Sequence, residues 1–173
     1  MTRYYATTRT PVGPFTTVVD ADGAVLASGW TTDVGELTRL AKVTGTAERR
    51  DDVGPATKAV LSYLDGDLTA VEAVPVRQHS GGEFLNHAWE VLREVPAGAP
   101  VTYSEFAVRA GRPAAVRAAA QACARNAAAL FVPCHRVLRL DGTLGGFRWG
   151  LPVKRWLLDF EAAAQPEYGL ASI

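Results

Sequence analysis

The sequence of 173 residues contains little cysteine or histidine and no long hydrophobic run. Its two cysteines, Cys123 and Cys134, are too few for a disulfide framework, and together with three histidines they fit no zinc-ligand spacing. We therefore expect free thiols, no bound metal and no cofactor. No apolar stretch approaches the roughly 18 to 20 residues of a membrane span, and no apolar signal core follows Met1. These absences argue against a membrane protein and predict a cytoplasmic location.

The chain also lacks an excess of charge of either sign, since 18 basic side chains balance 18 acidic ones. The distribution is nevertheless uneven, because residues 101–155 contain nine Arg and Lys side chains against only Glu105 and Asp141. A basic segment of this kind can follow a phosphate backbone, but it is also typical of an ordinary solvated surface. The charge therefore allows a nucleic-acid partner without requiring one.

The first 80 residues alternate short apolar segments with turn signals such as Asp20-Ala21-Asp22-Gly23. Strands are expected over residues 3–8, 15–20 and 24–28, helices over residues 34–42 and 55–64, and an extended stretch over residues 71–77. An antiparallel sheet combined with helices makes this part α+β. The small and polar residues His79-Ser80-Gly81-Gly82 form the best candidate for a linker, so we divide the chain into residues 1–80 and 81–173.

The second part shows helical periodicity, beginning with apolar side chains spaced over residues 84–95. A helix over residues 102–110, a break at Gly111-Arg112-Pro113 and a second helix over residues 113–125 form a helix-turn-helix pattern. The second helix is rich in alanine and projects the side chains of Arg117, Gln121 and Arg125. This pattern fits contact with a DNA groove, and it also fits two helices packed closely through their alanines.

The most suggestive chemical feature is Cys134, which follows an apolar stretch at residues 127–132 and Pro133. We expect the stretch to be a buried strand and the proline to turn the chain, so that the thiol points into a cleft. The adjacent His135 and Arg136 could lower the pKa of the thiol and favour the reactive thiolate. The alternative is an inert buried cysteine, because neighbouring side chains often point in opposite directions.

Other candidate side chains have weaker support from the residues alone. Glu161 lies beside the apolar stripe of the last helix. Such a carboxylate is usually solvated, but if it is partly buried it would bond His135 and strengthen that imidazole as a base. Cys123 lies in the alanine-rich helix without a nearby base, so we assign it to packing. His79 and His87 have no partners at ligand spacing and are left out of the site.

The segment Pro133-Cys134-His135-Arg136-Val137 resembles the acceptor motif of the methylated-DNA–protein-cysteine methyltransferases, also called O6-alkylguanine-DNA alkyltransferases. Further segments resemble this family in order and spacing: Tyr103-Ser104-Glu105, Ala115-Val116-Arg117-Ala118, Arg125-Asn126, Gly145-Gly146-Phe147-Arg148-Trp149-Gly150 and Lys154-Arg155-Trp156-Leu157-Leu158. The strong similarity covers residues 84–161. Residues 10–14 and 63–68 resemble the variable N-terminal domain of the family, so the resemblance extends over the whole chain.

The resemblance implies two domains and a DNA partner. Residues 1–80 would form a ribonuclease-H-like α/β domain, and residues 81–173 a mainly helical, winged-helix-like domain with the helix-turn-helix and the acceptor cysteine. The partner would be double-stranded DNA carrying O6-alkylguanine, bound through its minor groove by a monomer, with the damaged base flipped out. Arg117 would enter the base stack, and Tyr103 would help to rotate the nucleotide. The DNA-binding residues implied are Tyr103, Val116, Arg117, Ala118 and Gln121.

The resemblance also implies a single-use alkyl transfer from guanine O6, with O4-alkylthymine as a further candidate substrate. Glu161 would orient His135, which would deprotonate Cys134 through a water so that the thiolate attacks the alkyl carbon. Asn126 would brace the site, and Tyr103 would donate a proton or hydrogen bond to N3 of the leaving guanine. The thioether is stable, so each molecule would act once. The pocket residues implied are Val137, Phe147, Arg148 and Trp149.

Two departures from the family concern this pocket. Arg148-Trp149 stands where many relatives have a small residue, and Ala129 stands where some have proline. We expect Trp149 to narrow the entrance and slow the reaction of bulky O6-benzyl adducts. Two other functions fit parts of the pattern: an alkyltransferase-like protein that marks lesions without repairing them, and a cysteine hydrolase. Cys134 argues against the first, and the lack of a recognisable oxyanion sequence argues against the second.

Overall fold

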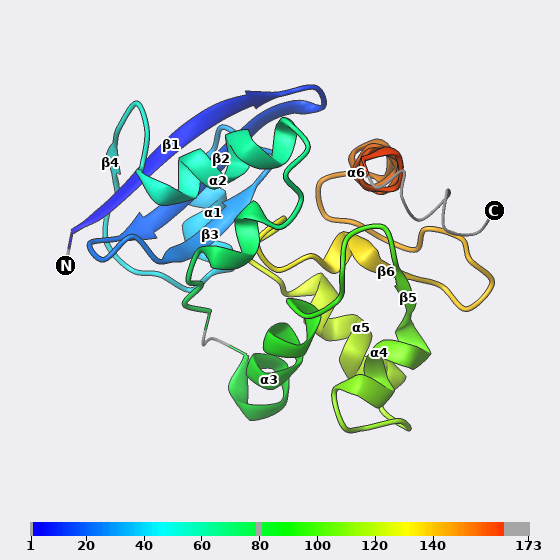
Figure 1. Ribbon diagram of the computed structural model, residues 1–173. Coiled ribbons are helices and arrows are strands. Elements are labelled where there is room, and N and C mark those ends of the chain that lie inside the picture. Colours follow the sequence, from blue (N-terminus) through cyan, green and yellow to red (C-terminus); the bar gives the residue numbers. More distant parts are fainter. Residues whose placement is uncertain (1, 79–80, 165–173) are drawn as a thin grey trace.

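The N-terminal half is built on a four-stranded sheet that carries a helix on each face (Figure 1). The computed structural model describes residues 2–78 and 81–164. Strands β1 (Arg3–Thr10), β2 (Gly13–Asp20) and β3 (Val25–Gly29) form an antiparallel meander, and β4 (Glu48–Arg49) pairs in parallel with β1, which gives the order β3-β2-β1-β4. The helices are α1 (Val34–Leu40) and α2 (Pro55–Leu64). The strands and helices predicted for this region are confirmed.

Strand β2 has buried side chains on both faces of the sheet. Successive side chains of a strand point to opposite sides, and a hydrophobic cluster covers each side. Phe15 and Val19 belong to the main hydrophobic core, which also contains Tyr63 of α2. Val18 points to the other face and packs with Leu37 of α1 in a second, smaller cluster. The sheet is therefore the central layer of this half of the molecule.

The C-terminal half is mainly helical, as expected. Its elements are α3 (Gly82–Leu92), β5 (Val101–Thr102), α4 (Tyr103–Arg109), α5 (Val116–Ala124), the 3-10 turn η2 (Cys134–Arg136), β6 (Val137–Leu138) and α6 (Leu151–Ala163). The short strands β5 and β6 pair in parallel, and α4 and α5 lie next to each other (Figure 1). Among the residues described, none of the helices is long and apolar enough to cross a membrane. The overall class is α+β.

Three predicted elements are wrong in detail. Residues 71–77 are not one extended stretch, because a 3-10 turn, η1 (Ala70–Ala73), precedes a single bridge from Val76 to Val25. The carbonyls of Val71, Glu72 and Val74 instead accept hydrogen bonds from the guanidinium of Arg93. These bonds satisfy the backbone of the turn without a strand partner.

The second helix of the predicted helix-turn-helix begins at Val116 rather than Pro113. Gly111 has a φ of 86°, and the N–H of Ala115 donates to the carbonyl of Arg112 in a separate turn. Pro113 therefore lies in the connection between α4 and α5. The helix pair itself is confirmed.

Residues 127–132 are buried as predicted, but they do not form a strand. Only Ala128 makes a β-bridge, to Ser28 at the edge of the sheet, and the hydroxyl of Ser28 donates to the carbonyl of Ala129 at 2.7 Å. The chain then turns, since the N–H of Val132 donates to the carbonyl of Ala128 and Leu130 has a φ of 75°. This turn brings the next residues back from the sheet toward the helices.

The two halves share one hydrophobic core, which contains buried side chains from both sides of the expected linker. The expected linker begins at His79 and Ser80, which lie outside the described residues. His79 is also one of the two histidines that were left out of the site. The segment between α5 and η2 runs beside β3 (Figure 1). The site described below is therefore built from residues of both halves.

Candidate active site

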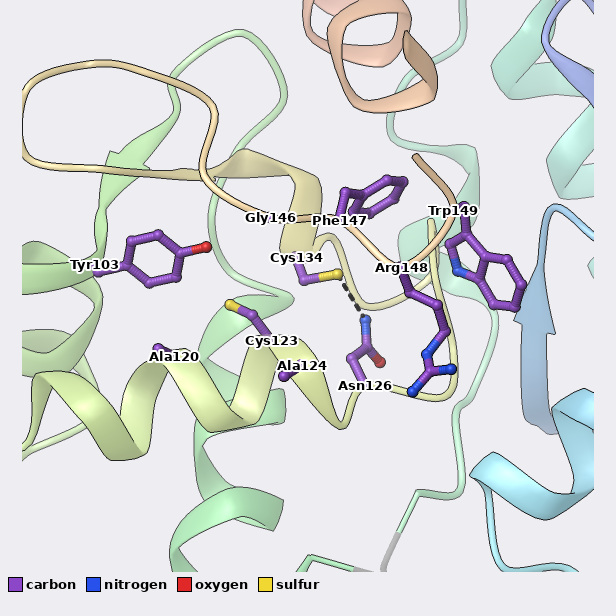
Figure 2. A pocket seen from close by; sticks show the side chains of 10 residues that line it. All are labelled: Tyr103, Ala120, Cys123, Ala124, Asn126, Cys134, Gly146, Phe147, Arg148 and Trp149. Atoms are coloured by element: carbon purple, nitrogen blue, oxygen red, sulfur yellow. Dashed lines mark hydrogen bonds between the residues drawn. The ribbon is translucent and has the colours of Figure 1, made fainter. Parts of the chain in front are cut away.

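Cys134 lies at the start of η2, where its thiol lines a cavity of about 380 Å³ between α4, α5 and residues 146–149 (Figure 2). Its side chain is 8% exposed. The side-chain amide of Asn126 donates to Cys134 Sγ at 3.2 Å and to the carbonyl of Val132 at 2.7 Å. The structure therefore brings together two of the predicted site residues and places the thiol in a cavity, as expected.

His135 and Glu161 meet in the interior behind this cavity. His135 Nε2 lies 2.7 Å from Glu161 Oε2, and both side chains are almost fully buried. Arg136 donates to the same carboxylate from two guanidinium nitrogens, each at 2.9 Å. The hydroxyl of Tyr63 in α2 donates to Glu161 Oε2 at 2.7 Å. Glu161 is therefore a buried hub that accepts hydrogen bonds from three side chains.

The charge states of this hub follow from its contacts. Burial alone raises the pKa of Glu161, but His135 and Arg136 stabilise the carboxylate so strongly that its pKa lies well below the usual value. Burial also lowers the pKa of His135, although Glu161 opposes this shift. An ionised Glu161 therefore accepts the Nε2–H of a neutral His135. His135 Nδ1 is then an acceptor, and it has no hydrogen-bond partner among the described residues.

The thiol environment corrects one expectation. Arg136 does not activate Cys134, because its guanidinium is directed to Glu161 and to the carbonyl of Val95. Burial raises the pKa of Cys134, whereas the hydrogen bond from Asn126 and the charge of Lys154 act in the opposite direction. The groups that favour the thiolate are therefore an amide and a lysine rather than the neighbouring arginine.

Lys154 was quoted in a motif but assigned no role. Its ammonium group is buried at the start of α6 and donates to the carbonyls of Val137, Leu144 and Gly146. These bonds tie the segment after β6 to the helix. Residues 101–155 contain nine basic side chains, and two of them, Arg136 and Lys154, are buried in the interior and do not contribute to the surface charge.

Tyr103 and Trp149 lie at opposite ends of the cavity (Figure 2). Burial, followed by the nearby thiols, raises the pKa of Tyr103 to about 12, so its hydroxyl is a hydrogen-bond donor at neutral pH. The indole of Trp149 rests directly on the backbone of Gly29 in β3, where a Cβ atom would overlap the ring. Trp149 also packs on the smaller hydrophobic cluster of the sheet. The residue expected to narrow the pocket is thus held by the N-terminal half.

The other predicted pocket residues divide into two groups. Phe147 and Arg148 line the cavity with Tyr103, whereas Val137 does not, since its side chain is fully buried and its backbone pairs with Val101. Cys123, which we assigned to packing, also lines the cavity. The alanine-rich helix around Cys123 and the lack of a nearby base suggested packing, but they could not show its proximity to the other thiol.

The predicted DNA-binding residues of α5 lie on its outer side. Arg117, Gln121 and Val116 are exposed and Ala118 is half-buried, whereas Ala119 and Ala122 face the core. Ala120 and Ala124 of the same helix line the cavity. One helix therefore connects the exposed basic surface with the wall of the thiol cavity.

Comparisons with known proteins agree with this geometry. Residues 83–163 match the family described as "6-O-methylguanine DNA methyltransferase, DNA binding domain". The chain is 50% identical over 82 residues to the bifunctional transcriptional activator/DNA repair enzyme Ada of Escherichia coli, a match that takes in 47% of this chain and only 23% of that protein.

Two further comparisons cover nearly the whole chain. It is 31% identical to the methylated-DNA–protein-cysteine methyltransferase of Methanosarcina acetivorans, over 92% of this chain and 99% of that protein. The crystal structure of the Mycobacterium tuberculosis OGT in complex with DNA superposes with a TM-score of 0.79 at 27% identity, covering 93% of this chain and 94% of the other. The chain therefore belongs to the methylated-DNA–protein-cysteine methyltransferase family.

Proposed function

We propose that this protein repairs DNA by transferring an alkyl group, methyl above all, from O6 of guanine to Sγ of Cys134, once per molecule. The observation that carries the proposal is the position of Cys134 in a cavity, with a hydrogen-bond donor on its sulfur and the buried His135–Glu161 pair beside it in the chain. Membership of the family supports the same reaction. O4-alkylthymine is a second candidate substrate.

The reaction begins with ionisation of the thiol. Neutral His135, oriented by Glu161, takes the thiol proton through a water at Nδ1, and Asn126 stabilises the thiolate by its hydrogen bond. The sulfur electron pair then forms a bond to the alkyl carbon while the bond from carbon to O6 breaks, and its electrons pass into the guanine ring. Tyr103, protonated at neutral pH, donates a hydrogen bond to N3 of the leaving base. The thioether that remains has no route back to a thiol.

The DNA would be bound as a double strand through its minor groove by a monomer. In this arrangement α4 and α5 act as the helix-turn-helix of a winged-helix-like domain, and the sheet belongs to a ribonuclease-H-like domain. The exposure of Arg117 and Gln121 on α5, next to the cavity-lining Ala120 and Ala124 of the same helix, supports this orientation. Flipping the damaged base would carry its O6 substituent from the stack to Cys134.

The test is to incubate the protein with a duplex containing labelled O6-methylguanine and to map the label by peptide mass spectrometry. Trypsin cuts after Arg117, Arg125 and Arg136, so Cys123 and Cys134 fall in different peptides. We expect one methyl group per molecule, all of it on residues 126–136. Repeated turnover, or label on residues 118–125, would contradict the proposal.

Arg117→Ala is expected to slow methyl transfer from duplex DNA by about tenfold to a hundredfold, because a flipped base must be replaced in the stack at a cost of a few kcal/mol. The measurement is single-turnover transfer from duplex DNA compared with transfer from free O6-benzylguanine, which needs no flipping and should keep its rate. Arg155→Ala removes the same charge from α6, where the side chain is exposed, and is the control. Equal losses in the two variants would show a general effect of charge.

Trp149→Ala is expected to raise the rate with O6-benzylguanine relative to O6-methylguanine, because the indole forms one end of the cavity. The native protein should react more slowly with the benzyl adduct than with the methyl adduct. The measurement is the ratio of the two second-order rates, which cancels any general loss of active protein. A native ratio near one would show that Trp149 does not restrict the pocket.

A further inference from the structure

Gln78, the last residue described before the expected linker, is buried against the thiol site although nothing in the sequence distinguished it. Its Oε1 accepts the backbone N–H of Ala127 at 2.5 Å, and its Nε2 donates to Asn126 Oδ1 at 3.0 Å. Asn126 is the residue whose amide donates to Cys134 Sγ. Gln78 thus lies one hydrogen bond away from the group that contacts the sulfur.

The direction of each bond in this chain is fixed by chemistry. A backbone N–H can only donate, so Ala127 requires the oxygen of the Gln78 amide to face it, and the NH₂ group must then face Asn126. Asn126 Oδ1 accepts this bond and another from the N–H of Ala128 at 3.0 Å. The NH₂ group of Asn126 is therefore turned to Val132 and Cys134.

We infer that Gln78 is a positioning residue for the acceptor thiol, which holds the amide of Asn126 with its NH₂ group on Cys134 Sγ. The inference deepens the proposed function and rests on it, since Cys134 is the acceptor there. Reversal of the Asn126 amide would place an oxygen on the sulfur and repel the thiolate. Gln78 makes this reversal costly because two NH₂ donors, Gln78 Nε2 and Asn126 Nδ2, would then face each other in the interior.

The position of Gln78 also links the thiol to the sheet. The preceding residues are bound to β3, since Val76 bridges Val25 and the N–H of Arg77 donates to the carbonyl of Val25 at 2.8 Å. Gln78 therefore comes from the N-terminal half and contacts residues of the C-terminal half. The N-terminal half would thus contribute, through Asn126, to the reactivity of the thiol.

Gln78→Met keeps the length of the side chain and removes both hydrogen bonds. We expect the apparent pKa of Cys134 to rise by about half a unit to one unit and methyl transfer at pH 7 to slow about threefold to tenfold, as for partial loss of a hydrogen bond to a charged group. The thiol pKa is read from the pH dependence of alkylation by chloroacetamide, followed on the peptide of residues 126–136. Gln78→Ala should shift the pKa in the same direction and serves if the methionine variant does not fold.

Ser28→Ala is the matched control, because it deletes a buried hydrogen bond to Ala129 at the same junction without touching Asn126. It should lower the melting temperature but leave the thiol pKa unchanged. In an Asn126→Ala background, Gln78→Met should produce no further shift of the thiol pKa. This cycle separates positioning from a general loss of stability.

Three results would overturn the inference: an unchanged thiol pKa in folded Gln78 variants, an equal shift in Ser28→Ala, or a full shift in the absence of Asn126. Failure of the proposed function is distinguishable from these results. In that case the native protein takes no methyl group from DNA, while the chloroacetamide titration still reports whether Gln78 controls the thiol.

Discussion

Glu161→Leu is expected to lower the free energy of unfolding by about 3–5 kcal/mol, because it leaves the guanidinium of Arg136 buried without a counter-charge. Arg136 is 2% exposed, and Glu161 accepts two of its three hydrogen bonds. His135 and Tyr63 lose a partner in the same substitution. The measurement is urea unfolding at pH 7.5, followed by circular dichroism.

Tyr63→Phe is the control for this prediction. It removes one of the bonds to Glu161 and no charge, so it should cost only about 1 kcal/mol. A Glu161→Leu variant as stable as Tyr63→Phe would mean that Arg136 finds another partner or reaches water. Such a result would contradict the description of Glu161 as the hub of the interior.

The same groups predict a loss of stability in acid. The pKa of folded His135 is lowered by burial, so the unfolded chain binds a proton first, and stability begins to fall as the pH drops below about 6.5. The pKa of folded Glu161 is also lowered, and its contribution is lost below about pH 4.3, where the unfolded carboxyl is protonated. In Glu161→Leu the second of these losses should be absent from a plot of melting temperature against pH.

Cys134→Ser is expected to reduce methyl transfer by at least about a thousandfold, or about 4 kcal/mol in the activation free energy. A serine hydroxyl is not ionised near neutral pH, and the surrounding groups, Asn126 and the distant charge of Lys154, only modestly favour an anion. Binding of an O6-methylguanine duplex should persist, because the hydroxyl fits the space of the thiol. Single-turnover transfer and fluorescence anisotropy with the same duplex measure the two properties.

Cys123→Ala tests the other thiol that lines the cavity. It should keep transfer within a few-fold of the native rate, because no base or amide donor among the described residues is bonded to Cys123. If Cys134→Ser still transferred methyl groups and the label appeared on Cys123, the assignment of the acceptor would be wrong. The pair of variants therefore identifies the nucleophile without relying on the family.

The parts of this structure that sequence predicted well are those with local signals. The hairpin strands, helices α1 and α2, the helix pair α4 and α5, and the sequence motif around Cys134 all depend on residues close together in the chain. The error at residues 127–132 arose because a buried apolar run satisfies a strand and a buried turn equally well, and the error at residues 71–77 arose because spaced valines do not fix an extended backbone. In both segments, partners distant in sequence, Arg93 in one case and Ser28 in the other, decide the backbone conformation.

Contacts between distant residues explain most of what was missed at the site. Tyr63 and Glu161 are 98 positions apart, and Gln78 and Asn126 are 48 apart. No sequence periodicity indicates that two such distant residues are in contact, and neither residue alone reveals its partner. The activating role expected of Arg136 was wrong for a related reason, since adjacency in the chain does not determine the direction of a side chain. Only the folded arrangement shows that Arg136 points inward to Glu161.

The contact between Gly29 and Trp149 makes these two positions epistatic. Any side chain at position 29 collides with the indole, so Gly29→Ala should be harmful in the native background and tolerated once position 149 is small. Selection for a protein that accepts larger adducts would therefore first replace Trp149 with a smaller residue. Only then would residues other than glycine be tolerated at position 29 of β3. Because Gly29 has no Cβ atom, a substitution at position 149 must come before a substitution at position 29.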